Sequence, residues 1–187
     1  MINEGMVREL FEKLQAKKAF VVFAESLTGG LISSELSKIE GASGVLWGSY
    51  VTYNTFAKER VLGVPSAVID KDGVVSSSCA YHMASGALEK SFAINGDYPT
   101  YSLAVTGMAG PSSSSADVEV GTVYIATAKL QNYRLDGMFP SLAVHCKTKH
   151  FHFRGDRQSV REQTLNNGIE MLLDLIDEYK EDRAGGI

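Results

Sequence analysis

Short apolar runs alternate with segments of helical periodicity along almost the whole chain, and this alternation limits the possible folds more than any other feature. Strand-like runs are predicted at 19–23, 49–53, 101–106, 121–127 and 143–153. Helices are predicted over 4–17, from 31 to 36, over 56–62, from 76 to 92 and from 157 to 176. This order predicts an α/β fold, a layered α/β/α sandwich around a mixed β-sheet.

Several polar residues stand where helices are expected to begin. Asn3 precedes the first helical segment, Ser76 to Ser78 precede the segment that runs through Phe92, and Asp156 precedes the last one. Such side chains accept hydrogen bonds from the free amides of the first helical turn. They therefore predict where three of the helices start.

Length, charge and cysteine content restrict the class of protein. The 187 residues are enough for one buried core, so one domain over 1–187 is expected, with 182–187 as a frayed tail. No stretch is long and apolar enough to suggest a membrane span, and a net charge of −4 argues against nucleic acid as a partner. The start of the chain lacks a secretory pattern, and two cysteines cannot make a disulfide framework. A cytoplasmic location is the expectation.

Glycine turns after strands are the first candidates for a binding site. Thr28-Gly29-Gly30 and the run that begins at Thr106-Gly107 could direct backbone N–H groups at an anion, although chain reversal alone would also explain such turns. No phosphate-loop, dinucleotide or local hydrolase motif is present. His150 and His152 share a strand face, but a third metal ligand is not evident. No metal and no cofactor is predicted.

An ordered set of short blocks is more specific than any single motif. These blocks are Ala24-Glu25-Ser26-Leu27-Thr28-Gly29-Gly30, Gly41-Ala42-Ser43, Val51-Thr52-Tyr53 with Lys58, Leu62-Gly63-Val64, Gly73-Val74-Val75-Ser76, 83–88, 104–111, Val120-Gly121-Thr122-Val123-Tyr124 and Phe153-Arg154-Gly155-Asp156-Arg157 with Val160-Arg161. In this order they resemble the CinA C-terminal domain family over nearly the whole chain.

The resemblance implies an amidase that converts nicotinamide mononucleotide to nicotinic acid mononucleotide and ammonia. It places the nucleophile at Ser43, completes the catalytic group with Tyr53 and Lys58, and associates Thr106 and Arg157 with the site. It also implies a homo-oligomer. Many family members carry a further N-terminal domain of a different fold, whose activity is not expected here.

The chemistry of these residues agrees with such roles. A serine attacks an amide only when a base takes its proton, and a lysine is a base only when neutral, so Lys58 is expected to be partly buried. The proton of Ser43 would pass to Lys58 directly or through Tyr53. The oxyanion would be stabilised by the backbone of 41–44 or of the Thr106-Gly107 turn. Arg157, at a helix start, would bind the substrate phosphate or the transition state.

Three departures from the family pattern keep alternatives open. Leu27 stands at a position that is usually cysteine, the loop at Ser112 to Ser115 is rich in serine where relatives have glycines and a Lys-Pro pair, and 135–147 is longer than usual. The chain could instead be a nucleotide-binding or competence- and damage-associated module without catalysis, or an amidase for a different amide.

Overall fold

The sheet has five strands, and its order brings the ends of distant segments together. A computed structural model describes residues 1–95, 100–112, 118–132 and 142–178. The strands are β1 (Phe20–Glu25), β2 (Leu46–Val51), β3 (Thr100–Gly107), β4 (Thr122–Asn132) and β5 (Leu142–His152). They lie in the order β2-β1-β3-β4-β5, with β1 parallel to both neighbours and the β3–β4 and β4–β5 pairs antiparallel. The mixed sheet predicted from the sequence is thus confirmed.

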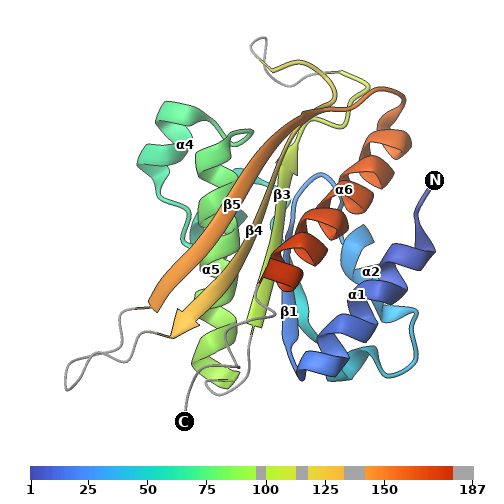
Figure 1. Ribbon diagram of the computed structural model, residues 1–187. Helices are drawn as coiled ribbons and strands as arrows, with labels where there is room; N and C mark the ends of the chain where they lie inside the picture. Colours follow the sequence, from blue (N-terminus) through green and yellow to red (C-terminus); the bar gives the residue numbers. More distant parts are fainter. Residues whose placement is uncertain (96–99, 113–117, 133–141, 179–187) are drawn as a thin grey trace, which may run out of the picture.

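Helices cover both faces of this sheet. They are α1 (Glu4–Lys17), α2 (Leu31–Ser37), α3 (Thr55–Leu62), α4 (Ser66–Asp72), α5 (Ser77–Asn95) and α6 (Arg157–Glu178), with one 3₁₀ turn, η1 (Ala42–Gly44). Figure 1 shows α1, α2 and α6 on one face and α4 and α5 on the other. Because α3 packs against α5, it belongs to the second layer.

Two apolar cores separate the three layers. Side chains of β1 point alternately to the two faces, so Val21 and Phe23 join the core under α1 and α6, while Val22 and Ala24 join the core under α5. All four are fully buried. A strand buried on both faces reads as a continuous apolar run, which is why the first strand could be predicted from the sequence.

The expected helix starts are confirmed by hydrogen bonds. The side chain of Asn3 accepts from the amide of Met6 at 3.2 Å, and the first helix spans the predicted residues. Ser76 Oγ accepts from the amide of Cys79 at 3.1 Å at the start of α5. Asp156 caps α6 in the same way.

Two elements differ from the prediction, and three predicted segments lie wholly or partly outside the residues that the structure describes. Helix α4 was not predicted, and β2 begins at Leu46, three residues before the predicted start. The tail at 182–187, most of the serine-rich loop and 135–141 of the longer segment lie outside the described residues. Within the described ranges, no helix combines the length and the apolar character needed to cross a bilayer.

One glycine allows α3 and α5 to approach closely, and it gives a test of this packing. A Cβ atom on Gly86 would lie 1.9 Å from the carbonyl oxygen of Leu62, the last residue of α3. Gly86→Ala is therefore expected to lower the free energy of unfolding by about 1–3 kcal/mol, as overpacking does. Urea unfolding measures this. Gly44→Ala is the control, because its Cβ would meet nothing within 4 Å, and equal effects of the two changes would contradict the close contact.

Candidate functional site

A cavity of about 460 Å³ lies where the carboxyl ends of three neighbouring strands meet. Ser26 follows β1, Tyr53 follows β2, and Gly107 ends β3, so parallel pairing brings all three to the same edge of the sheet. Each of them lines the cavity, together with Lys58 of α3 and Arg157 of α6. Ligand sites in α/β folds commonly lie at this edge.

The centre of the cavity is a contact between a serine and a lysine. Lys58 Nζ donates to Ser26 Oγ at 2.9 Å and to the carbonyl oxygen of Thr52 at 2.7 Å. Lys58 is 2% exposed and Ser26 is 7% exposed. The Thr52 carbonyl holds the amine in place, so the amine faces the hydroxyl across hydrogen-bond distance.

The surroundings of Lys58 favour its uncharged form. Burial lowers the pKa of the Lys58 ammonium, and the Coulombic attraction of a Cys79 thiolate would oppose this shift. Cys79 itself is fully buried, and burial raises the pKa of its thiol to about 11. Because this thiol stays protonated near neutral pH, it places no negative charge beside the amine. The expectation that Lys58 is buried is confirmed.

Arg157 joins two of the segments that surround the cavity. Its Nη1 donates to the carbonyl oxygen of Gly110 at 2.6 Å, and its Nη2 donates to the Tyr53 hydroxyl. Tyr53 is 55% exposed, so this pair lies at the mouth of the cavity. The Tyr53 hydroxyl is bonded to Arg157, whereas Lys58 reaches Ser26 directly, without Tyr53 between them.

The end of β3 and the turn that follows it form another part of the cavity wall. Thr106 and Gly107 both line it, as predicted, together with Met108. The Thr106 hydroxyl donates to the carbonyl oxygen of Val74 at 2.6 Å, which ties this turn to the segment before α5. Of the two turns considered for the oxyanion, this one lies beside Ser26.

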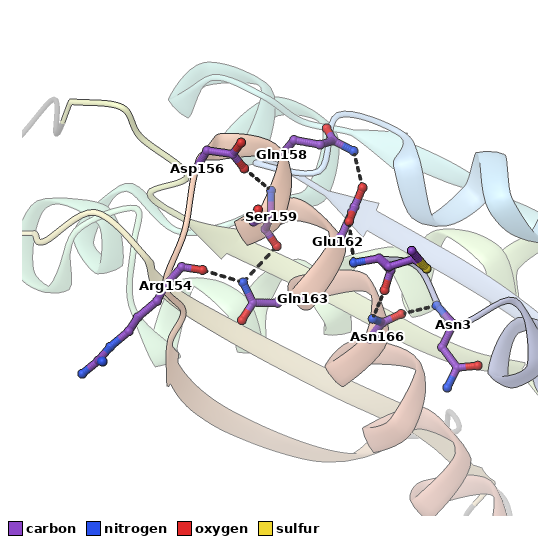
Figure 2. Close-up of polar contacts among 9 residues, drawn as sticks. Asn3, Arg154, Asp156, Gln158, Ser159, Glu162, Gln163 and Asn166 are labelled. Atoms are coloured by element: carbon purple, nitrogen blue, oxygen red, sulfur yellow. Dashed lines mark hydrogen bonds and ion pairs between the residues drawn. The ribbon is translucent and has the colours of Figure 1, made fainter.

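The start of α6 is held in a fixed orientation, and this matters because Arg157 is its first residue. Figure 2 shows Asp156 accepting from the amide of Ser159, at 2.8 Å. Gln163 donates to the carbonyl oxygens of Arg154 and Ser159 at 2.8 and 3.0 Å. These bonds fasten the chain before the helix to its first turns, so the Arg157 guanidinium is directed toward the cavity.

The structure does not bring Ser43 to this site, and the predicted contact between Ser43 and Lys58 is wrong. Ser43 is exposed in η1, before β2 begins, whereas Lys58 comes after β2 ends. A strand of six residues separates the two edges by roughly 20 Å. Ser26 takes the place that had been expected for Ser43. A signal for it was present in the sequence, because Ser26 follows a buried strand directly.

Gly29 and Gly30 are also not part of the cavity lining. Both have positive φ, 60° and 92°, and they reverse the chain between β1 and α2. The amides that would bind an anion at the start of α2 already donate to a carboxylate of the chain, since Ile32 N and Ser33 N bond to Glu25 at 3.1 and 3.0 Å. The predicted substrate-binding role of the two glycines therefore has no support in the geometry.

His150 and His152, both in the last strand, take separate partners. His150 stacks on Tyr124, with ring centroids 4.7 Å apart, and His152 Nε2 lies 3.9 Å from a carboxylate oxygen of Glu119. Among the residues that the structure describes, no three His, Cys, Asp or Glu side chains form a group able to hold a metal ion. The histidine pair thus has a structural explanation.

Comparisons with known proteins place these observations in a family. The chain is 38% identical over 171 residues to a CinA-like protein of Thermosipho melanesiensis, which covers 91% of this chain and 38% of the relative. It is 39% identical over 163 residues to a CinA-like protein of Fervidobacterium nodosum, with 87% and 35% covered. The chain thus spans little more than a third of the length of these relatives.

Solved structures resemble the whole fold. The competence/damage inducible protein CihA of Agrobacterium tumefaciens matches with a TM-score of 0.76 and 32% identity, covering 94% of this chain and 98% of that one. A competence-damaged protein (CinA) superfamily protein of Escherichia coli matches with a TM-score of 0.76 and 28% identity, covering 92% and 89%. The family model of the CinA C-terminal domain matches residues 3–176. The chain therefore belongs to the CinA C-terminal domain family.

Proposed function

We propose that this domain is an amide hydrolase in which Ser26 is the nucleophile and Lys58 is the general base. The observation that carries the proposal is the 2.9 Å contact between Lys58 Nζ and Ser26 Oγ in a buried part of an open cavity. A neutral amine has two N–H groups and one lone pair. With one N–H on the Thr52 carbonyl, the lone pair can accept the proton of Ser26.

The reaction then follows in two balanced stages. Ser26 Oγ forms a bond to the amide carbon while its proton moves to Lys58, and the C–N bond breaks as Lys58 gives that proton to the departing ammonia. Water then attacks the carbonyl carbon of the resulting ester and gives a proton to Lys58. The bond between that carbon and Ser26 Oγ breaks as Lys58 returns the proton to Oγ, and the acid is released. The turn that begins at Thr106 lines the same cavity, and we expect it to lie beside the carbonyl oxygen on which negative charge develops.

The proposed substrate is nicotinamide mononucleotide, which the family resemblance implies. The cavity offers polar and apolar walls for such a molecule, since Leu27, Val75 and Met108 line it together with the catalytic pair. Purified protein is expected to release ammonia from the mononucleotide and to form the corresponding acid. Binding without turnover at any pH between 6 and 9 would instead favour a catalytically inactive binding module.

Arg157 is assigned to the substrate phosphate, and a pair of substrates tests this assignment. Its guanidinium lies at the mouth and would exchange the Tyr53 hydroxyl for phosphate oxygens. Arg157→Ala is expected to raise KM for the mononucleotide by about 10- to 100-fold, the value of a charged hydrogen bond, and to change KM for the uncharged riboside by less than about threefold. Ammonia release measures both.

The control is Arg154→Ala, three residues earlier. Arg154 is exposed, and Figure 2 shows its side chain directed away from α6. If Arg157→Ala weakens the riboside as much as the mononucleotide, the residue orients the site rather than binding phosphate.

Three further expectations belong to the same proposal. The partner would be a small nucleotide rather than a nucleic acid, the protein would act in the cytoplasm in pyridine-nucleotide salvage, and it would form a homo-oligomer. Light scattering of the purified protein checks the last of these. An amide other than nicotinamide mononucleotide stays the alternative substrate, and a panel of nucleotide and ribosyl amides separates the two.

A further inference from the structure

A buried carboxylate stands directly before the proposed nucleophile. Glu25 is the last residue of β1, and it is 0% exposed. Its oxygens accept four hydrogen bonds, from Ile32 N at 3.1 Å, Ser33 N at 3.0 Å, Ser33 Oγ at 2.8 Å and Ser49 Oγ at 3.1 Å. A buried charge is tolerated when it is satisfied in this way. The proposed mechanism makes no use of this group.

These four hydrogen bonds join the segments on both sides of the nucleophile. Glu25 lies just before Ser26, and the connection that contains Ser26 leads from β1 to α2. The Glu25 carboxylate accepts from two amides at the start of α2. The bond from Ser49 joins the carboxylate to β2, the strand that precedes Thr52 and Lys58. A single side chain therefore connects the segment of the nucleophile with the helix after it and with the strand that leads to the base.

The charge of Glu25 is directed away from the base. Side chains alternate along β1, so Glu25 lies on the face of Val21 and Phe23, under α1 and α6. Lys58 belongs to α3, in the layer of α5 on the other face. A carboxylate in contact with the amine would favour its charged form and remove the base. The placement of Glu25 thus fixes the turn without this penalty.

We propose that Glu25 is a positioning residue, which holds Ser26 Oγ within reach of Lys58 by anchoring the turn to α2 and β2. This inference rests on the proposed role of Ser26 as nucleophile. It predicts that loss of the carboxylate slows formation of the covalent intermediate and leaves substrate binding nearly unchanged, because Glu25 does not line the cavity.

The first test replaces the carboxylate by an amide of the same shape. Glu25→Gln puts an NH₂ group where N–H and O–H donors converge, so the turn must shift. A shift of about 1 Å costs roughly 100-fold in rate. The expected result is a 100-fold lower rate of Ser26 labelling by a fluorophosphonate and a similar loss of kcat, with KM for the mononucleotide within about threefold. Glu35→Gln is the matched control, a nearly buried carboxylate of α2 that pairs with Lys38.

The second test uses rescue. Glu25→Ala leaves a space beside the amides of Ile32 and Ser33, and formate or acetate is expected to restore labelling at least tenfold, whereas neutral formamide does not. If both Glu25 variants fail to fold by circular dichroism, Ser49→Ala removes one of the four bonds and is expected to slow labelling severalfold.

The outcomes separate this inference from the proposed function. Normal labelling and kcat in Glu25→Gln, or in Ser49→Ala where that variant is needed, would overturn the positioning role while the nucleophile stands. A loss in Glu25→Ala that no anion restores would overturn the role of the charge. If the unaltered protein is neither labelled at Ser26 nor able to release ammonia, the proposed function fails, and the inference fails with it.

Discussion

Ser26→Ala is expected to lower the rate of ammonia release by about 10⁴-fold or more, because a methyl group cannot form the covalent bond to the amide carbon. The Lys58 amine loses one partner in this variant but keeps the Thr52 carbonyl, so the fold should persist. Steady-state ammonia release measures the effect. The mass of the protein after fluorophosphonate treatment then shows whether position 26 is the only labelled site.

Ser43→Ala is the matched control for this prediction. Ser43 is exposed in η1 at the far edge of the sheet, so its replacement should leave the rate within about twofold. A full loss of activity in Ser43→Ala, with Ser26→Ala still active, would reject the geometric assignment and restore the one that the family resemblance first implied.

Lys58→Met is expected to lower the rate of ammonia release about as much as Ser26→Ala does. The change keeps the aliphatic length of the side chain but removes the amine, which among the described residues is the one nitrogen group that contacts Ser26 Oγ. Lys58→Arg should also be inactive, since a guanidinium stays charged at all accessible pH values and cannot accept a proton.

In the unaltered protein, kcat should rise with pH as the Lys58 ammonium loses its proton. Because burial lowers the pKa of this group, the rise should be centred below the pKa of a free lysine, near ~10.4.

The same residue should connect stability to pH. The pKa of Lys58 is lower in the folded chain than in the unfolded one, so the unfolded chain binds more protons between the two values. The free energy of unfolding should therefore rise with pH across that window and level off above the pKa of a free lysine. Urea unfolding at pH 7 and pH 9.5 tests this, with Lys58→Met lacking this contribution. A free energy difference between the two proteins that does not change with pH would contradict the buried, proton-releasing amine.

Local patterns account for the parts of the fold that could be predicted. The first helix spans Glu4–Lys17 as expected, because Asn3 supplies the cap and the buried Val7, Leu10 and Leu14 recur at helical spacing. The strands were found because apolar runs bounded by turn residues are recognisable without any knowledge of their neighbours. Helix α4 was not found because it has no fully buried residue, so its sequence carries no apolar stripe.

The serine that meets Lys58 could not be predicted from the sequence. Lys58, Thr106 and Arg157 meet in the cavity as expected, whereas Ser43 does not, although it is closer to Lys58 in sequence than Ser26 is. Strand β2 lies between Ser43 and Lys58, and a strand carries the chain from one edge of the sheet to the other. Ser26 lies 32 residues before Lys58, but both follow strands that run parallel and side by side.

The sequence by itself determined the α/β class and most of the helices and strands, because these depend on residues within a few positions of one another. Short ordered blocks also indicated that Lys58, Thr106 and Arg157 belong to one site. Only the tertiary structure decided which serine meets Lys58, that the amides at the start of α2 bind Glu25, and that Arg157 donates to the Tyr53 hydroxyl. The physical reason is that these contacts depend on strand order and direction. Both result from the burial of two apolar cores by the whole chain, which no local spacing records.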